Sequence, residues 1–149
     1  MEPKIVTKGA FKVLGMQAVG GKPEDVDFMG LWDQFSKRVN EISSNPTVYY
    51  GVCECLGENG FRYTASIEVA DLSKIPANMV GMDIPEGRYA VFTHKGPFIT
   101  LGETYRYIYE VWLPNSNEEQ AYRPGFEYYD ERFKCDSEGS EFDIYAPIK

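Results

Sequence analysis

The strongest constraint on the fold is a repeated order of secondary-structure signals. In each half of the 149-residue chain, a strand-like segment precedes an amphipathic helix, and two further strand-like segments follow. Two such units predict a duplicated α+β fold. We expect one domain over residues 1–149, built from β-α-β-β modules at about residues 3–70 and 84–149. A pseudo-two-fold axis would relate the modules, giving an antiparallel sheet with two main helices.

Hydrophobic periodicity defines the first unit. A strand is predicted over residues 10–18. Residues 28–43 have apolar side chains every three or four positions, which is typical of one face of a helix. Two strands rich in β-branched and aromatic residues follow over residues 47–56 and 61–69, joined by a Gly-Glu-Asn-Gly turn.

The second unit repeats this order. A strand is predicted over residues 88–96, a helix over 98–112, and two strands over 126–133 and 142–149. Residues 71–87 contain two prolines and two glycines and have no sustained period. They are predicted to form a connector between the two units.

The charge balance restricts the class of partner. Lys and Arg total 15 against 23 Asp and Glu, so the net charge is −8. Such a chain repels phosphate backbones, which argues against direct binding to nucleic acid and is compatible with a cationic ligand. No apolar run reaches the length of a membrane span, and the N-terminal residues lack a signal-peptide pattern. We expect a cytoplasmic protein with reduced cysteines and no membrane partner.

Sequence motifs for cofactors, metals and nucleophilic catalysis are missing. Cys53 and Cys55 lack the spacing of a zinc knuckle, and the glycine pair at 20–21 is a plain turn rather than a phosphate-binding loop. No Gly-x-Ser-x-Gly motif occurs. His94, the single histidine, is interpreted as a hydrogen-bonding residue at a strand end. We expect no cofactor and no structural metal.

Short segments spread over nearly the whole chain together point to one family. They are YG at 50–51, FRYTA at 61–65, EV at 68–69, IPEGRYAVF at 84–92, HKGP at 94–97, TY at 104–105, WLPNS at 112–116, FEYYD at 126–130 and IYAPI at 144–148. In this order and spacing they resemble the GyrI-like effector-binding family. Its small-molecule domains occur alone and fused to DNA-binding modules in AraC-type and MerR-type regulators.

The resemblance implies an aromatic pocket between the halves, with one buried glutamate that meets cationic, often hydrophobic ligands. Glu127 stands where that glutamate is expected, and strand alternation gives it the same face as Tyr129. From the residues alone, Glu127 could instead pair with Arg62 or Arg132 on a solvated sheet face. Because no segment remains for a helix-turn-helix module, we expect that the chain does not bind DNA itself.

The chain has 11 tyrosines, whose rings attract cations and whose hydroxyls suit ligands with polar edges. Most of them must belong to the core or the surface. Besides Glu127, we select these ligand-binding candidates: Tyr63, Tyr109, Trp112, Tyr129 and Tyr145.

The same residues serve more than one class of function. The favoured interpretation is a stand-alone, non-enzymatic binding protein for hydrophobic aromatic or cationic molecules. The resemblance also implies an alternative, a hydrolase that opens strained cyclopropane rings of aromatic natural products. There Glu127 would act as general base, and Tyr63 or Tyr109 would orient water or donate a proton. A third alternative is a regulator that binds a protein target such as gyrase.

We predict that the chain does not retard duplex DNA in a gel-shift assay at low salt, where electrostatic attraction to phosphate is strongest. Its net charge of −8 is the reason. Tight duplex binding under these conditions would contradict the charge argument.

Overall fold

One antiparallel sheet of eight strands runs through the computed structural model, which describes residues 2–134 and 138–149. The strand order is β1-β6-β8-β7-β3-β4-β2-β5. The strands are β1 Lys4–Lys8, β2 Phe11–Gly20, β3 Tyr49–Cys55, β4 Phe61–Val69, β5 Val80–Ile84, β6 Gly87–Lys95, β7 Gly125–Tyr129 and β8 Glu141–Ile148. The predicted α+β fold, an antiparallel sheet with two main helices, is confirmed.

The outermost strands connect the two modules. β1 leads into β2 but pairs with β6, and β5 leads into β6 but pairs with β2. Each module therefore contributes its leading strand to the sheet half of the other. The predicted connector over 71–87 is wrong where β5 lies. The local signal of β5 is weak because the alternating segment Val-Gly-Met-Asp-Ile has only five residues and lies between the prolines at 76 and 85. Pairing with β2 supplies the strand structure.

The first helix is shorter than predicted. α1 spans Phe28–Ser36, and the Asp27 carboxylate caps it by accepting a hydrogen bond of 3.0 Å from the Gly30 amide. A 3₁₀ turn at Val39–Glu41 replaces the rest of the predicted helix and keeps Val39 buried. Further 3₁₀ turns lie at Pro23–Asp25 and Gly57–Asn59.

The second helical segment begins where predicted and extends three residues further. It comprises a 3₁₀ turn at Phe98–Thr100, α2 at Leu101–Arg106, a π-helical stretch at Tyr107–Trp112 and α3 at Leu113–Asn115. π-Helical turns are rare and often occur at functional sites. No helix in the described part of the chain is long and apolar enough to cross a membrane.

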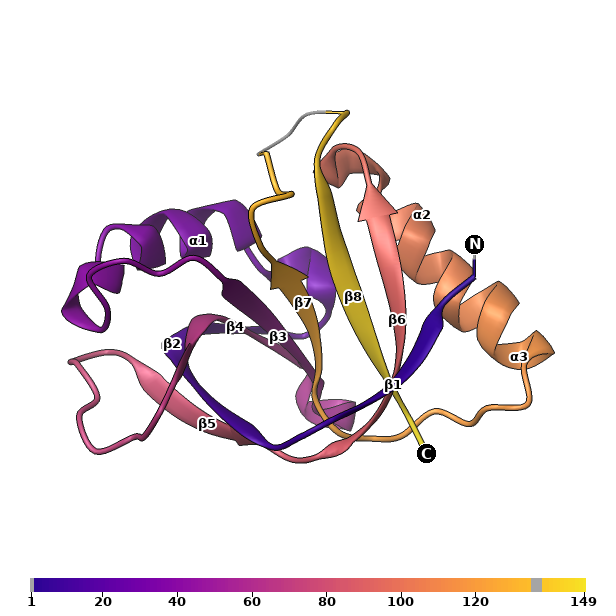
Figure 1. The fold of residues 1–149 in the computed structure, drawn as a ribbon, viewed down its shortest axis with the longest axis horizontal. Coiled ribbons are helices and arrows are strands. Elements are labelled where there is room, and N and C mark those ends of the chain that lie inside the picture. The colour runs from indigo at the N-terminus through magenta and orange to yellow at the C-terminus, as the bar shows by residue number, and fades with distance from the viewer. Residues whose placement is uncertain (1, 135–137) are drawn as a thin grey trace.

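Both helical segments pack on the same face of the sheet. α1 buries Leu31 and Phe35 against β4, and the second segment buries Ile108 against β6 and β8. In Figure 1, α1 lies on one side of the molecule and α2–α3 on the other, with β3 and β7 between them. Because β3 and β7 are paired neighbours, the seam between the modules runs along this pair.

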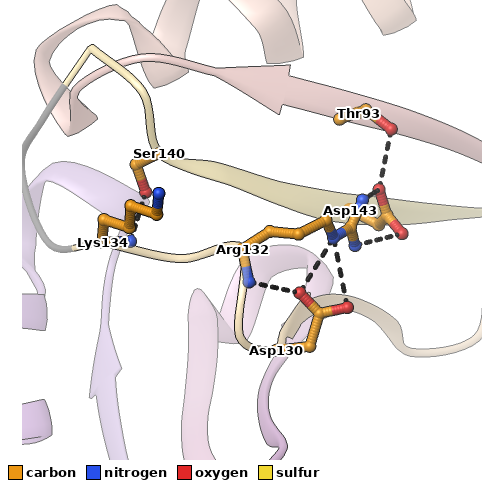
Figure 2. A network of polar contacts seen from close by, with 6 residues as sticks. All are labelled: Thr93, Asp130, Arg132, Lys134, Ser140 and Asp143. Carbon is orange, nitrogen blue, oxygen red and sulfur yellow. Dashed lines mark hydrogen bonds and ion pairs between the residues drawn. The ribbon is translucent and has the colours of Figure 1, made fainter.

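A polar network holds the end of β7 (Figure 2). The Arg132 guanidinium donates to the carboxylate of Asp130 at 2.9 Å and to that of Asp143, on β8, at 2.8 Å. The Thr93 hydroxyl of β6 donates to Asp143 at 2.8 Å. Since Asp130 directly follows β7, these bonds connect the end of β7 to its neighbour β8 and, through Asp143, to β6.

We predict that Gly15→Ala lowers the free energy of unfolding by about 1–3 kcal/mol. A Cβ at this position of β2 would overlap the carbonyl oxygen of Ala65, which belongs to the paired strand β4. Gly9→Ala is the matched control because nothing lies within 4 Å of its added Cβ. Urea unfolding measures both variants, and equal stability of the two would contradict the packing argument.

Candidate functional site

The Glu127 carboxylate lies at the centre of the sheet and is 5% exposed. Three tyrosine hydroxyls donate hydrogen bonds to it. Tyr63 and Tyr129 donate to Oε1 at 2.8 and 2.7 Å, and Tyr105 donates to Oε2 at 2.7 Å. Among the described residues, no Lys, Arg or His forms an ion pair with Glu127. The carboxylate is therefore hydrogen-bonded but has no cationic partner.

The two arginines considered as partners are engaged elsewhere. Arg62 forms a bidentate pair with Glu54, at 2.8 and 2.9 Å, and Arg132 pairs with Asp130 and Asp143. The alternative in which Glu127 pairs with Arg62 or Arg132 on a solvated face is therefore wrong. Glu127 faces the interior below the helices.

Strand geometry explains how tyrosines from different elements reach one carboxylate. Glu127 and Tyr129 are two residues apart on β7 and share a face. Tyr63 lies on β4, one strand beyond β3, so its side chain must cross β3 to reach β7. Gly51 pairs with Glu127 at that crossing, and a Cβ there would overlap the Tyr63 hydroxyl. The missing side chain of Gly51 makes the Tyr63–Glu127 hydrogen bond possible.

Burial and hydrogen bonding oppose each other at Glu127. Burial raises the pKa of its carboxyl group above the usual value, while the hydroxyls of Tyr105, Tyr129 and Tyr63 lower it in part. Burial, reinforced by the Glu127 charge, raises the pKa of all three phenols well above 10. The hydroxyls therefore stay protonated and remain donors at neutral pH.

A cavity of about 1040 Å³ borders Glu127. α1 contributes Phe28 and Trp32, the second helical segment contributes Tyr105 and Tyr109, and Tyr63 lies on the sheet side. Burial raises the pKa of Tyr109 to about 12. Exposed apolar side chains also border the cavity: Met29 is 68% exposed and Tyr122 is 90% exposed. The cavity is a space between the modules with many aromatic residues in its lining, and its charged lining residues are Glu24, Glu54, Glu127, Arg106 and Arg123.

The structure brings four of the six sequence-selected side chains together: Glu127, Tyr63, Tyr109 and Tyr129. Tyr145 borders the cavity, but its ring stacks on Phe126 at 4.5 Å on the opposite face of the sheet. Its neighbour Ile144 is the residue that pairs with Glu127.

Trp112 does not line the cavity. Its ring packs on Phe92 of β6 at a centroid distance of 5.2 Å. In an α-helix, Trp112 would follow Tyr105 and Tyr109 along one stripe. The π-helical stretch Tyr107–Trp112 has a wider turn than an α-helix, so the α-helical spacing from Tyr105 to Trp112 does not apply.

Two further side chains complete the site, Tyr105 and Trp32. Tyr105 donates directly to Glu127, and the Trp32 indole Nε1 donates to the Tyr63 hydroxyl at 2.9 Å. The sequence feature that could have indicated these two residues is their position on the apolar faces of the two helices, where Tyr105 lies one turn before Tyr109. That pattern also fits core packing, so it could not single them out.

His94 forms hydrogen-bond contacts near the end of β6, as the sequence predicted, and it is also buried. Its Nδ1 lies 2.8 Å from the Thr104 hydroxyl, and its Nε2 lies 3.2 Å from the Pro97 carbonyl oxygen. These contacts tie β6 to the start of the second helical segment, next to Tyr105. Within residues 2–134 and 138–149, no group of three or more His, Cys, Asp or Glu side chains is arranged to hold a metal ion.

Comparison with known proteins identifies the family. The model of the GyrI-like small molecule binding domain matches residues 1–149. The chain belongs to the GyrI-like family. Transcriptional regulator BrlR of Pseudomonas aeruginosa is 37% identical to this GyrI-like chain over 151 residues, which cover 99% of the chain and 56% of BrlR. The chain thus spans about half the length of this curated relative.

Solved structures share the GyrI-like fold. SAV2435, solved bound to tetraphenylphosphonium, has a TM-score of 0.79 and 16% identity, over 100% of this chain and 94% of SAV2435. EcmrR, solved in complex with DNA, has a TM-score of 0.75 and 16% identity, over 99% of this chain and 57% of EcmrR. At these identities the similarity establishes the fold alone.

We predict that Glu127→Gln becomes more stable relative to the wild-type protein as the pH rises. The Glu127 pKa is raised in the folded state, so the folded protein binds more protons than the unfolded chain as pH rises above the ordinary value of 4.5. The contribution of Glu127 to the free energy of unfolding of the wild type therefore falls through this range, whereas glutamine does not titrate. Urea unfolding at about pH 4 and about pH 7 measures the difference. If the variant and the wild type differ in free energy of unfolding by the same amount at both pH values, the prediction is contradicted.

Proposed function

We propose that this chain binds hydrophobic aromatic cations in the cavity beside Glu127, with the carboxylate facing the positive charge of the ligand. The observation that carries the proposal is the buried Glu127 carboxylate, which accepts three hydroxyl donors and has no cationic partner among the described residues. A buried ion without a partner is costly, by several kcal/mol. A cation that enters the cavity supplies the missing charge.

The surrounding rings suit the same ligand class. Trp32, Tyr63, Tyr105, Tyr109 and Tyr129 border the cavity. Each aromatic face attracts a desolvated cation by roughly 0.5–2 kcal/mol. The rings also provide apolar area for flat or bulky aromatic groups. The net charge of −8 favours the approach of cations over anions.

The hydrogen-bonding state of Glu127 narrows the class of cation. A carboxylate has about four acceptor positions, and tyrosine hydroxyls occupy three of them. The Glu127 carboxylate therefore has few free acceptor positions for the N–H donors of a primary ammonium ion. Such an ion loses several hydrogen bonds to water when it enters the cavity. Phosphonium and quaternary ammonium ions carry charge without N–H donors. We therefore infer a preference for such permanent cations.

The comparisons support this proposal. The structurally similar SAV2435 was solved with tetraphenylphosphonium, a bulky aromatic cation of this class. BrlR is a transcriptional regulator, which makes ligand sensing for a regulatory partner or module a consistent use of the domain. For this chain, we propose ligand binding without direct contact to DNA.

We predict that Glu127→Gln weakens tetraphenylphosphonium binding by about a hundredfold or more. Loss of one member of a buried ion pair costs on the order of 3–5 kcal/mol, and about 1.4 kcal/mol corresponds to tenfold in Kd. Isothermal titration calorimetry measures the affinity, and thermal melting checks the fold. Tetraphenylborate, an anion of similar size and shape, is the matched probe and should bind the variant no more weakly than the wild type. If the folded variant binds tetraphenylphosphonium as tightly as the wild type, Glu127 is not part of the binding site.

The hydrolase alternative is tested by the fate of the ligand. The protein is incubated for a long period with an aromatic compound that carries a strained cyclopropane ring, and the compound is then analysed by mass spectrometry. Recovery of the unchanged compound supports a binding protein. A product heavier by one water, formed by the wild type and not by Glu127→Gln, would show that the protein is a hydrolase rather than a binding protein.

A further inference from the structure

We propose that Trp32 is a positioning residue of the Glu127 site: its indole N–H fixes the Tyr63 hydroxyl as a donor to the Glu127 carboxylate. The expected effect of Trp32 on ligand binding rests on the proposed function. The positioning itself is a property of the ligand-free protein. The side chain lies on α1 and makes no direct hydrogen bond to Glu127 among the described contacts.

The direction of the relay follows from donor chemistry. An indole nitrogen can only donate, and a phenol hydroxyl has one proton. The Tyr63 oxygen lies 2.9 Å from the Trp32 nitrogen and 2.8 Å from Glu127 Oε1. It must accept from Trp32, so its own proton points to Glu127. The Trp32 donor therefore favours the orientation in which the Tyr63 hydroxyl donates to Glu127 over one in which it accepts a proton from a neutral Glu127.

Packing holds the indole in place for this role. The Trp32 ring makes edge contacts with Tyr49, Tyr63 and Tyr129, with centroids 6.1, 6.3 and 5.6 Å away. Leu31 and Phe35, its neighbours on α1, are buried in the core and fix the helix against the sheet. Because Trp32 also borders the cavity, the residue that orients the relay is one that a bound ligand would touch.

The consequence is a bias of Glu127 toward its charged form. A hydroxyl held in the donating orientation stabilises a carboxylate more than a carboxylic acid. The titratable groups that face Glu127 from the packed elements are Tyr63 on β4, Tyr105 on α2, Tyr129 on β7, Cys53 on β3 and His94 on β6. Burial and the Glu127 charge raise the pKa of the Cys53 thiol, as they do for the three phenols. His94 is common to all the variants below.

The test is the titration of Glu127 in the ligand-free protein, followed by the carbon-13 NMR signal of its side-chain carboxyl group. Glu127→Gln assigns that signal by removing it. We expect Trp32→Phe, which keeps an aromatic ring and loses the N–H, to raise the titration midpoint by about 0.5 pH unit or more. Trp112→Phe is the matched control outside the cavity and should leave the midpoint unchanged. Tyr63→Phe removes the same relay from its other end and should raise the midpoint at least as much.

A double variant separates positioning from general disturbance. In the Tyr63→Phe background, Trp32→Phe should add no further shift, because Trp32 acts through the Tyr63 hydroxyl. An unchanged midpoint in Trp32→Phe, an equal shift in Trp112→Phe, or additive shifts in the double variant would each overturn the proposal. Tetraphenylphosphonium titrations of the same proteins test the proposed function separately. Absent phosphonium binding by the wild type refutes that function, while the NMR titration still decides the role of Trp32.

Discussion

The structure depends on a contact in which one buried carboxylate receives three tyrosine hydroxyls. Glu127 on β7 accepts hydrogen bonds from Tyr63 on β4, Tyr105 on α2 and Tyr129 on its own strand. These bonds compensate part of the cost of burying a charge, and they tie both modules to one point. Gly51 is as necessary as the tyrosines, because any side chain there would fill the space through which the Tyr63 hydroxyl reaches Glu127. Within residues 2–134 and 138–149, the outcome is a buried, hydrogen-bonded carboxyl group that forms no ion pair with a basic side chain.

The duplicated architecture explains where this anion lies. Each module contributes a leading strand to the other half of the sheet, β1 to β6 and β5 to β2, so the modules cannot separate without breaking sheet edges. The β3–β7 pair then becomes the centre of one continuous sheet, with a helix on each side of it in Figure 1. The cavity opens between those helices and takes its lining from both modules. A single module would present only part of the rings and would lack either the carboxylate or the Tyr63 donor.

Stability and binding place opposite demands on the centre of this protein. The ligand-free state carries a carboxyl group whose pKa is raised by burial, so its ionised form weakens the fold at neutral pH. Hydroxyl donors reduce that cost without neutralising the charge, which leaves the charge available to a ligand. An arginine in their place would form an internal ion pair and remove the attraction for an external cation. Arg62 instead pairs with Glu54, and Arg132 pairs with Asp130 and Asp143, away from Glu127 (Figure 2).

The amino-acid sequence was sufficient for the module order, the second helix and the shared face of Glu127 and Tyr129, because all of these are local periodicities read within one element. It was insufficient for β5, whose strand structure comes from pairing with β2, and for Trp112, which packs on Phe92 at the end of a π-helical stretch that the α-helical periodicity did not predict. It also left open which face of β8 meets the cavity. A period of two separates the faces of a strand but does not say which face aligns with that of its neighbour, and this register puts Tyr145 opposite Phe126 and away from Glu127. Tyr105 and Trp32 could be assigned to the site only from the tertiary structure, in which the packed helices place both in the hydrogen-bond network of Glu127. The local sequence does not distinguish an aromatic residue of the core from one whose polar atom bonds to a residue distant in the chain.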